Sequence, residues 1–239
     1  MINLNERDNP IVLQYLANLD ENKCNDLEKF FYFKNHRLIH KWRNYFEIYD
    51  RHFSKFRNKD VTIVEIGVFQ GGSLQMWKEY FGPKCRVIGV DIDPNCKNFE
   101  EPQIEIMIGS QDDVNFLSEL KEKVPKIDIL IDDGGHFMHQ QKATFDNLFD
   151  HISEEGVYLC EDLHTSYWPQ FGGSYKGKDS FIEYSKNFID YINAWHSLQG
   201  DLTVNNFTRS AQSLHYYDSV LVIEKRKMYV PLDLYYVSL

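Results

Sequence analysis

The 239-residue chain lacks a long apolar run, a cysteine framework and an excess of basic residues. No apolar stretch approaches the roughly 18 to 20 residues of a membrane-spanning helix, and residues 1–10 lack the apolar core of a secretory leader. The four cysteines are far apart and form no CxxC pair, so we expect free thiols in a reducing compartment. These absences together predict a cytoplasmic protein with no membrane partner.

Basic residues are outnumbered: 26 Lys and Arg face 36 Asp and Glu, which gives a formal net charge of −10. Nucleic-acid phosphates and anionic membranes both attract basic surfaces. The charge balance therefore argues against either partner, although one local pocket can still hold a phosphorylated small molecule. Aromatic residues are plentiful at 15% and can supply a large core.

The length predicts one domain with an appendage, which we divide into a helical N-terminal extension, 1–58, and a main domain, 59–239. The strongest helical signal in the extension covers 36–58. Its apolar residues recur mostly at spacings of three or four: Leu38, Trp42, Tyr45, Phe46, Tyr49, Phe53 and Phe56. We expect this helix to pack on the core. Tyr45 or Tyr49 could also cover a cofactor, and the aromatic stripe could serve a homo-oligomer.

Strand-like and helix-like segments alternate from residue 60 to residue 160, which is typical of a parallel α/β sheet. The expected strands are 61–66, 86–91, 104–108, 127–131 and 156–160, and the expected helices are 73–81, 112–124 and 137–152. A loop at 163–177, a long helix at 179–198 and a terminal antiparallel hairpin, 212–217 with 220–225, complete the prediction. The tail 226–239 has no clear pattern.

A glycine-rich loop follows the first expected strand, from Gly67 to Ser73. Glycines permit a tight turn and a close approach of ligand to the start of a helix. The second strand ends in Asp91, which can accept hydrogen bonds from ribose hydroxyls. Each signal alone is weak, since such loops are often only turns, but together they predict a nucleoside cofactor. The spacing matches neither a P-loop nor the dinucleotide fingerprint, which disfavours a dehydrogenase.

The candidate cofactor-binding residues lie on these strand ends, on the segment after the third and fourth strands, and on the N-terminal helix. They are Glu65, Gly67, Gln70, Gly71, Ser73, Asp91, Ile92, Gln111, Asp112, Asp132, Tyr45 and Tyr49. We expect residues 109–112 to lie beside the adenine base of this nucleoside cofactor.

Acidic pairs end two further strands: Asp132-Asp133 follows the fourth strand and Glu161-Asp162 follows the fifth. Adjacent strands end about 5 Å apart, so these carboxylates would repel one another strongly. A divalent cation is the natural compensation, and oxygen donors favour Mg²⁺, Mn²⁺ or Ca²⁺ over zinc. The alternative is a set of solvated strand-end acids. His136 could be a metal ligand, a residue that contacts and orients the ligands, or a general base.

At these residues the sequence resembles the class I S-adenosylmethionine-dependent methyltransferases, and specifically the metal-dependent sugar O-methyltransferases of the mycinamicin and tetracenomycin type. The resemblance covers roughly 36–225. The matching stretches are 64–73 (VEIGVFQGGS), 89–94 (GVDIDP), 131–136 (IDDGGH) and 161–168 (EDLHTSYW), with 45–50 (YFEIYD) before the first strand. The larger N-terminal domain of the antibiotic enzymes does not fit in 1–58.

The resemblance implies a Rossmann-like fold with a seven-stranded, mostly parallel sheet and an antiparallel last strand. It implies Mg²⁺ (or Mn²⁺) held by Asp133, Glu161 and Asp162, with His136 as the base that activates a sugar hydroxyl for methylation by S-adenosylmethionine. The expected acceptor is a small-molecule sugar, first of all a nucleotide-activated sugar for surface polysaccharide, or a glycosylated metabolite.

The aromatic loop 163–177 supplies the candidate substrate-binding residues His164, Tyr167, Trp168 and Tyr175. They could stack on a sugar face under a flexible lid, or simply pack a crossover. Three other functions stay open: a catechol-type O-methyltransferase, a non-catalytic nucleoside-binding domain, and an iron oxygenase. The last needs two histidines and a carboxylate, whereas only His136 is well placed and His164 is remote.

Overall fold

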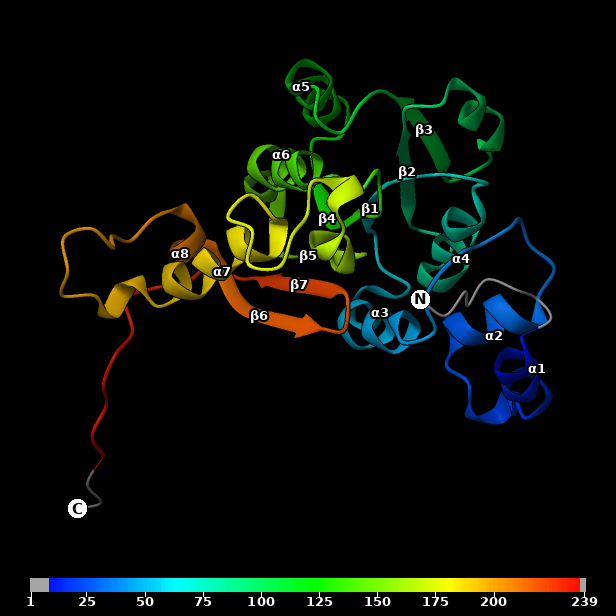
Figure 1. Ribbon diagram of the computed structural model, residues 1–239, viewed down its shortest axis with the longest axis horizontal. Coiled ribbons are helices and arrows are strands. Elements are labelled where there is room, and N and C mark those ends of the chain that lie inside the picture. The colour runs from blue at the N-terminus through cyan, green and yellow to red at the C-terminus, as the bar shows by residue number, and fades with distance from the viewer. Residues whose placement is uncertain (1–8, 237–239) are drawn as a thin grey trace.

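The computed structural model describes residues 9–236 and is built around a seven-stranded sheet with the order β3-β2-β1-β4-β5-β7-β6 (Figure 1). The strands are β1 Thr62–Ile66, β2 Arg86–Asp91, β3 Ile104–Ile108, β4 Ile127–Asp132, β5 Ile152–Cys160, β6 Ala211–Tyr217 and β7 Val220–Lys225. Strands β1 to β5 are parallel, whereas β7 runs antiparallel to both of its neighbours. The expected α/β fold, its antiparallel last strand and the terminal hairpin are confirmed.

Helices cover both faces of the sheet (Figure 1). They are α1 Pro10–Ala17, α2 Asp26–Phe33, α3 Tyr45–Phe53, α4 Gly72–Phe81, α5 Val114–Lys123, α6 Met138–Leu148, α7 Phe181–Ile192 and α8 Asn206–Ser210. Helices α2 to α4 share one apolar core with the sheet, and α5 to α8 share the other. Both faces of the central strands are therefore buried, which is why those strands read as nearly continuous apolar runs.

Side-chain caps set helix starts that differ slightly from the predicted ones. Asp113 accepts hydrogen bonds from the backbone of Asn115 and Phe116, so α5 begins at Val114 rather than at 112. Ser180 caps α7 in the same way. That helix ends at Ile192 and is followed by a separate 3₁₀ turn, so the predicted range 179–198 is too long.

The helix predicted over 36–58 is wrong in its first half. Only Tyr45–Phe53 is α-helical, and the segment 34–44 is a loop that crosses the start of α4. The crossing is close: a Cβ on Gly72 would lie 2.4 Å from the carbonyl oxygen of Arg37 and 2.5 Å from that of Leu38. A helix at 36–44 would not follow this path, and Leu38 is accordingly 55% exposed.

The aromatic residues of α3 pack on the core of the domain, as predicted for this part of the stripe. Tyr45, Phe46, Tyr49 and Phe53 are all buried in the core shared with α4. They are therefore not available for a contact between subunits.

Among residues 9–236, no helix combines the length and apolar character needed to cross a bilayer. The tail 226–236 has no helix or strand. Residues 237–239 of the tail, and residues 1–8 of the expected leaderless start, lie outside the described part of the chain.

Candidate active site

A cavity of about 570 Å³ opens at the carboxyl ends of the central strands. Strand β1 pairs with β2 on one side and with β4 on the other, so the strand order reverses at this point. Open α/β sheets bind ligands at such a position. The lining comes from the α2–α3 loop (38–42), the loop after β1 (66–70), the end of β2 (90–93), and the segments 109–111, 133–136 and 161–162.

The glycine loop is pressed against the acidic segment after β4. Gly67 has φ +99°, and a Cβ there would lie 2.0 Å from the carbonyl oxygen of Asp133. Any side chain would force the two strand-end loops apart, so this position requires glycine. The predicted cofactor loop is therefore in direct backbone contact with the predicted metal ligand Asp133.

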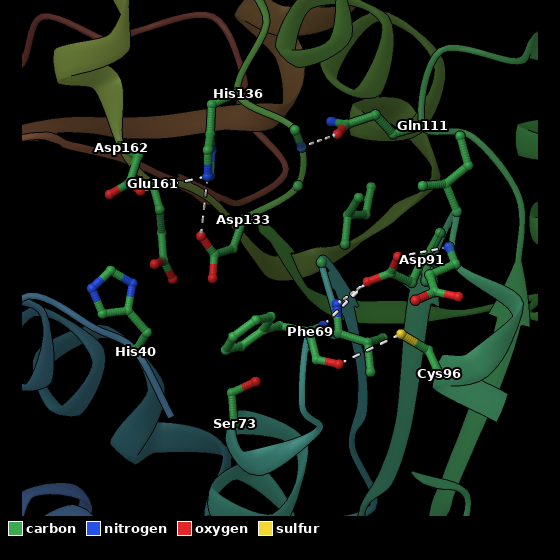
Figure 2. A pocket seen from close by; sticks show the side chains of 18 of the residues that line it. His40, Phe69, Ser73, Asp91, Cys96, Gln111, Asp133, His136, Glu161 and Asp162 are labelled. Atoms are coloured by element: carbon green, nitrogen blue, oxygen red, sulfur yellow. Dashed lines mark hydrogen bonds and ion pairs between the residues drawn. The ribbon is translucent and has the colours of Figure 1, made fainter. Parts of the chain in front are cut away.

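Asp91 organises the opposite wall (Figure 2). One carboxylate oxygen accepts hydrogen bonds from the backbone of Val68 at 2.8 Å and Phe69 at 3.2 Å, and the other accepts from Asp93 at 2.9 Å. Burial opposes ionisation, but these three backbone donors together hold the pKa of Asp91 below its usual value. Asp91 is therefore an anion that lines the cavity, as a group that accepts ribose hydroxyls must be.

Two of the predicted cofactor residues hold the loops together. The Gln111 amide nitrogen donates to Asp132 at 2.9 Å, and its oxygen accepts from Gly135 at 2.8 Å. Burial raises the pKa of Asp132 to about 7. Asp112 accepts a hydrogen bond from Ser110 and lies 3.0 Å from the His139 ring nitrogen.

The cavity brings together seven of the twelve predicted cofactor residues: Gly67, Gln70, Ser73, Asp91, Ile92, Gln111 and Tyr45. Glu65, Gly71, Asp112, Asp132 and Tyr49 lie outside its lining. Glu65 remains close by, because it accepts a hydrogen bond from the lining residue Ser73 at 2.7 Å. Direct contact of these residues with a cofactor stays a prediction.

The predicted metal ligands and His136 meet at one end of the cavity (Figure 2). The His136 Nε2 atom lies 3.9 Å from an oxygen of Asp133 and 3.5 Å from an oxygen of Asp162. One ligand atom from each of the three residues falls within 4.8 Å of the others. His136 (φ +57°) and Asp162 (φ +54°) both have left-handed backbone, a strain that persists only where the surroundings enforce it.

Glu161 is turned inward and hydrogen-bonded. One of its oxygens accepts from the Tyr49 hydroxyl at 2.6 Å, while the Tyr45 hydroxyl donates to Asp162 at 2.7 Å. Burial, together with repulsion from Asp133, raises the pKa of Glu161 well above its usual value. The two tyrosines, predicted as cofactor covers, thus hold the acidic pair after β5.

Lys41 is the site residue that the sequence did not predict. Its ammonium contacts Glu65, Asp133 and Glu161, and its side chain is 2% exposed. Although burial acts against it, the three carboxylates raise the pKa of Lys41 above its usual value. No motif contains Lys41, and its partners lie 24, 92 and 120 positions away along the chain. Only the fold reveals the contact.

The aromatic loop lies beside the acids, outside the cavity lining. The His164 ring stands 4.6 Å from the Trp168 ring and 5.7 Å from the Trp42 ring. Tyr167 and Tyr175 are exposed. Phe171, another aromatic residue of the predicted stacking loop, brings its ring to 6.5 Å from that of His136. Substrate contact by His164, Tyr167, Trp168 and Tyr175 stays a prediction.

Known proteins share both sequence and fold with this chain, although no protein-family model matches it. The 8-demethyl-8-α-L-rhamnosyl tetracenomycin-C 2′-O-methyltransferase of Streptomyces olivaceus is 35% identical over 197 residues, covering 78% of this chain and 52% of that protein. The mycinamicin VI 2″-O-methyltransferase of Micromonospora griseorubida is 35% identical over 189 residues, covering 74% of this chain and 47% of that protein.

Among solved structures, the MycE methyltransferase of the mycinamycin biosynthetic pathway, in complex with Mg, SAH and mycinamycin VI, superposes with a TM-score of 0.75 at 31% identity. The match covers 86% of this chain and 54% of that structure. The chain thus spans about half the length of the curated relatives it matches. Over the region that they share, it is a homologue of the mycinamicin- and tetracenomycin-type sugar O-methyltransferases and has their Rossmann-like methyltransferase fold.

Proposed function

We propose that the chain is a metal-dependent O-methyltransferase that moves a methyl group from S-adenosylmethionine to a sugar hydroxyl. The observation that carries this proposal is the convergence of Asp133, Asp162 and His136 at the end of a cavity that Asp91 and the glycine loop also line. The names of the relatives and the Mg and SAH bound to MycE support it.

The residues present fit both groups. Asp133, Glu161 and Asp162 offer only oxygen donors, which suit Mg²⁺ or Mn²⁺. The His136 Nδ1 atom is buried and has no hydrogen-bond partner among the described residues, whereas Nε2 lies toward Asp133 and Asp162. The cavity beside them, about 570 Å³, falls in the usual range for small-molecule and cofactor sites.

Three acids would hold the ion: Asp133, Glu161 and Asp162. When bound, S-adenosylmethionine supplies a methyl group on a positively charged sulfur, and the divalent ion makes a hydroxyl that touches it easier to deprotonate. His136 would take the hydroxyl proton on Nε2 as the oxygen bonds to the methyl carbon and the bond between that carbon and the sulfur breaks, so that the neutral thioether S-adenosylhomocysteine leaves. Asp162 and Asp133, at 3.5 and 3.9 Å from that nitrogen, stabilise the imidazolium that results.

The acceptor is a sugar on a small molecule. The name of the tetracenomycin relative states a rhamnosyl acceptor. Trp42, which lines the cavity, and Trp168, which lies outside its lining, both place their rings against that of His164. A nucleotide-activated sugar for surface polysaccharide and a glycosylated metabolite are the two acceptor classes that we propose, in a cytoplasmic setting.

A methyl-transfer assay tests the proposal. The protein is incubated with labelled S-adenosylmethionine and a panel of nucleotide sugars, rhamnosyl glycosides and catechols, with and without a chelator. We expect transfer to sugar hydroxyls that the chelator abolishes and added Mg²⁺ restores. Transfer to catechols alone would point to the catechol-type enzyme instead, and chelator-resistant transfer would contradict the metal site.

A further inference from the structure

The acid cluster consists of Glu65, Asp133, Glu161 and Asp162. We propose that Lys41 is the counter-ion of this cluster while no divalent ion is bound, and that its ammonium leaves Asp133 and Glu161 when the ion binds. The inference rests on the metal-dependent function proposed above. It assigns a role to a residue outside every sequence motif, and it makes the α2–α3 loop responsive to the metal.

All three hydrogens of the Lys41 ammonium have carboxylate acceptors in the structure. Its nitrogen lies 2.9 and 3.0 Å from the two oxygens of Glu161 and 3.4 Å from an oxygen of Glu65, and it also donates to Asp133. An ammonium has three hydrogens to donate, and here three carboxylates accept them. Lys41 therefore neutralises the part of the cluster that is most deeply buried.

The three predicted metal ligands are not all close to one another, because Glu161 is paired with Lys41. Asp133 and Asp162 offer oxygens that lie with His136 within 4.8 Å of one another, whereas Glu161 is outside that group. One oxygen of Asp133 faces His136 and the other faces Lys41. An ion held by all three acids would have to take oxygens that now bind the ammonium, and two cations on the same oxygens repel at short range.

The loop that carries Lys41 is anchored on both sides. On one side it is fixed by Arg37, whose backbone N–H donates to the side-chain oxygen of Gln75 on α4 at 3.1 Å and whose guanidinium donates to the carbonyl of Phe99 at 2.9 Å. On the other side α3 begins at Tyr45. Between these anchors, His40 and Trp42 are exposed and line the same cavity as the acids (Figure 2). Ile39 is a further anchor, because it is buried in the core. A displacement of the ammonium would therefore involve residues 40–44.

A purely structural ion pair would behave differently. Removing one partner of any buried pair leaves an uncompensated charge and destabilises the fold. If Lys41 serves only the fold, that loss has no link to the metal. If it is a counter-ion exchanged for metal, a bound divalent ion replaces the lost charge, and the empty cluster binds that ion more tightly than before.

The test is a Mg²⁺ titration by calorimetry, combined with thermal unfolding with and without Mg²⁺. The proteins are the unaltered chain, Lys41→Met, the charge-retaining Lys41→Arg, and Lys225→Met. The last removes another buried lysine, which donates to two backbone carbonyls of the fold, and so serves as the matched control.

We expect Lys41→Met to bind Mg²⁺ about tenfold or more tightly than the unaltered chain. Lys41→Arg keeps the positive charge and should stay within about threefold of the unaltered chain. Without metal, the melting temperature of Lys41→Met falls, and Mg²⁺ recovers most of the loss. For Lys225→Met the loss is the same with and without Mg²⁺.

Unchanged or weaker Mg²⁺ binding by Lys41→Met would overturn the counter-ion role and leave the metal site intact. A Lys41→Met chain that folds neither with nor without millimolar Mg²⁺ would also overturn it, because the ion could not then replace the ammonium. No Mg²⁺ binding by the unaltered chain would overturn the metal site itself, and this inference with it.

Discussion

At the scale of single residues, an experiment can distinguish the proposed role of His136 from that of its neighbour Asp133. His136 presents Nε2 to two acids at 3.5 and 3.9 Å, whereas Asp133 is one of the acids that would hold the ion. A base and a ligand differ in what their loss does to metal affinity, so the two roles make different predictions.

His136→Ala should lower turnover by about 10²- to 10⁴-fold, the usual contribution of a positioned base, and should leave Mg²⁺ affinity nearly unchanged. Asp133→Asn should lower both turnover and Mg²⁺ affinity, since it removes a charged oxygen ligand. Initial rates and calorimetry on both variants check this. Near-normal turnover of His136→Ala would refute its assignment as the base.

The acids and the glycines were predictable because each stands directly after a strand that the sequence reveals. The buried runs before Gly67, Asp133 and Glu161 fix their common edge of the sheet. Lys41 was not predictable, because it lies in a loop whose path depends on contacts with α4 and on carboxylates far along the chain. Its neighbours in sequence even favour a helix there.

At the scale of elements, β7 carries a lysine into the core. The Lys225 ammonium donates to the carbonyls of Phe149 and Ile152, at 2.7 Å each. Burial lowers the pKa of Lys225 from 10.5 to about 8. The unfolded chain therefore binds more protons than the folded chain between those two values, and stability contributed by this group rises with pH across that window.

We expect the free energy of unfolding of the unaltered chain, relative to that of Lys225→Met, to increase from about pH 8 to about pH 10.5. Subtracting the variant removes the titration of tyrosines and cysteines, which both proteins share. Denaturant unfolding at several pH values measures the difference. A difference that stays flat, or falls, across this interval would show that the folded chain does not hold Lys225 with a lowered pKa.

Helix boundaries were less predictable than strand order. The central strands β1, β2 and β4 are short and buried on both faces, so the sequence locates them well. Strand β5 begins at Ile152, four residues before the predicted start and at the last residue of the predicted helix 137–152, because its first half is partly exposed and polar. The error at 36–44 arose because Leu38 and Trp42 continue the spacing of the true helix α3, although both are exposed on a loop. Contact of that loop with α4 outweighs its local helical preference.

At the scale of the whole molecule, the cavity joins loops from both halves of the sheet, so a ligand that fills it should stabilise the entire fold. S-adenosylhomocysteine at about 100 times its dissociation constant should add about 2.7 kcal/mol to the free energy of unfolding. For a chain of this size that is a rise of several degrees in melting temperature.

Thermal unfolding with S-adenosylhomocysteine, and with NAD as the control, checks this expectation. The glycine spacing departs from the dinucleotide fingerprint, so NAD should leave the melting temperature unchanged. Equal stabilisation by both compounds, or by NAD alone, would count against a methyl-donor site.

The contact between Gly72 and the carbonyls of Arg37 and Leu38 has a cost and a benefit in different parts of the molecule. Gly72 is the first residue of α4, where alanine would favour the helix by at most the roughly 1 kcal/mol that separates glycine from alanine inside a helix. The chain forgoes that gain so that a neighbouring backbone can pass within touching distance. The missing methyl group thus leaves room for the segment that carries Lys41 to pass over the amino end of α4, and this path brings the ammonium to Glu65, Asp133 and Glu161.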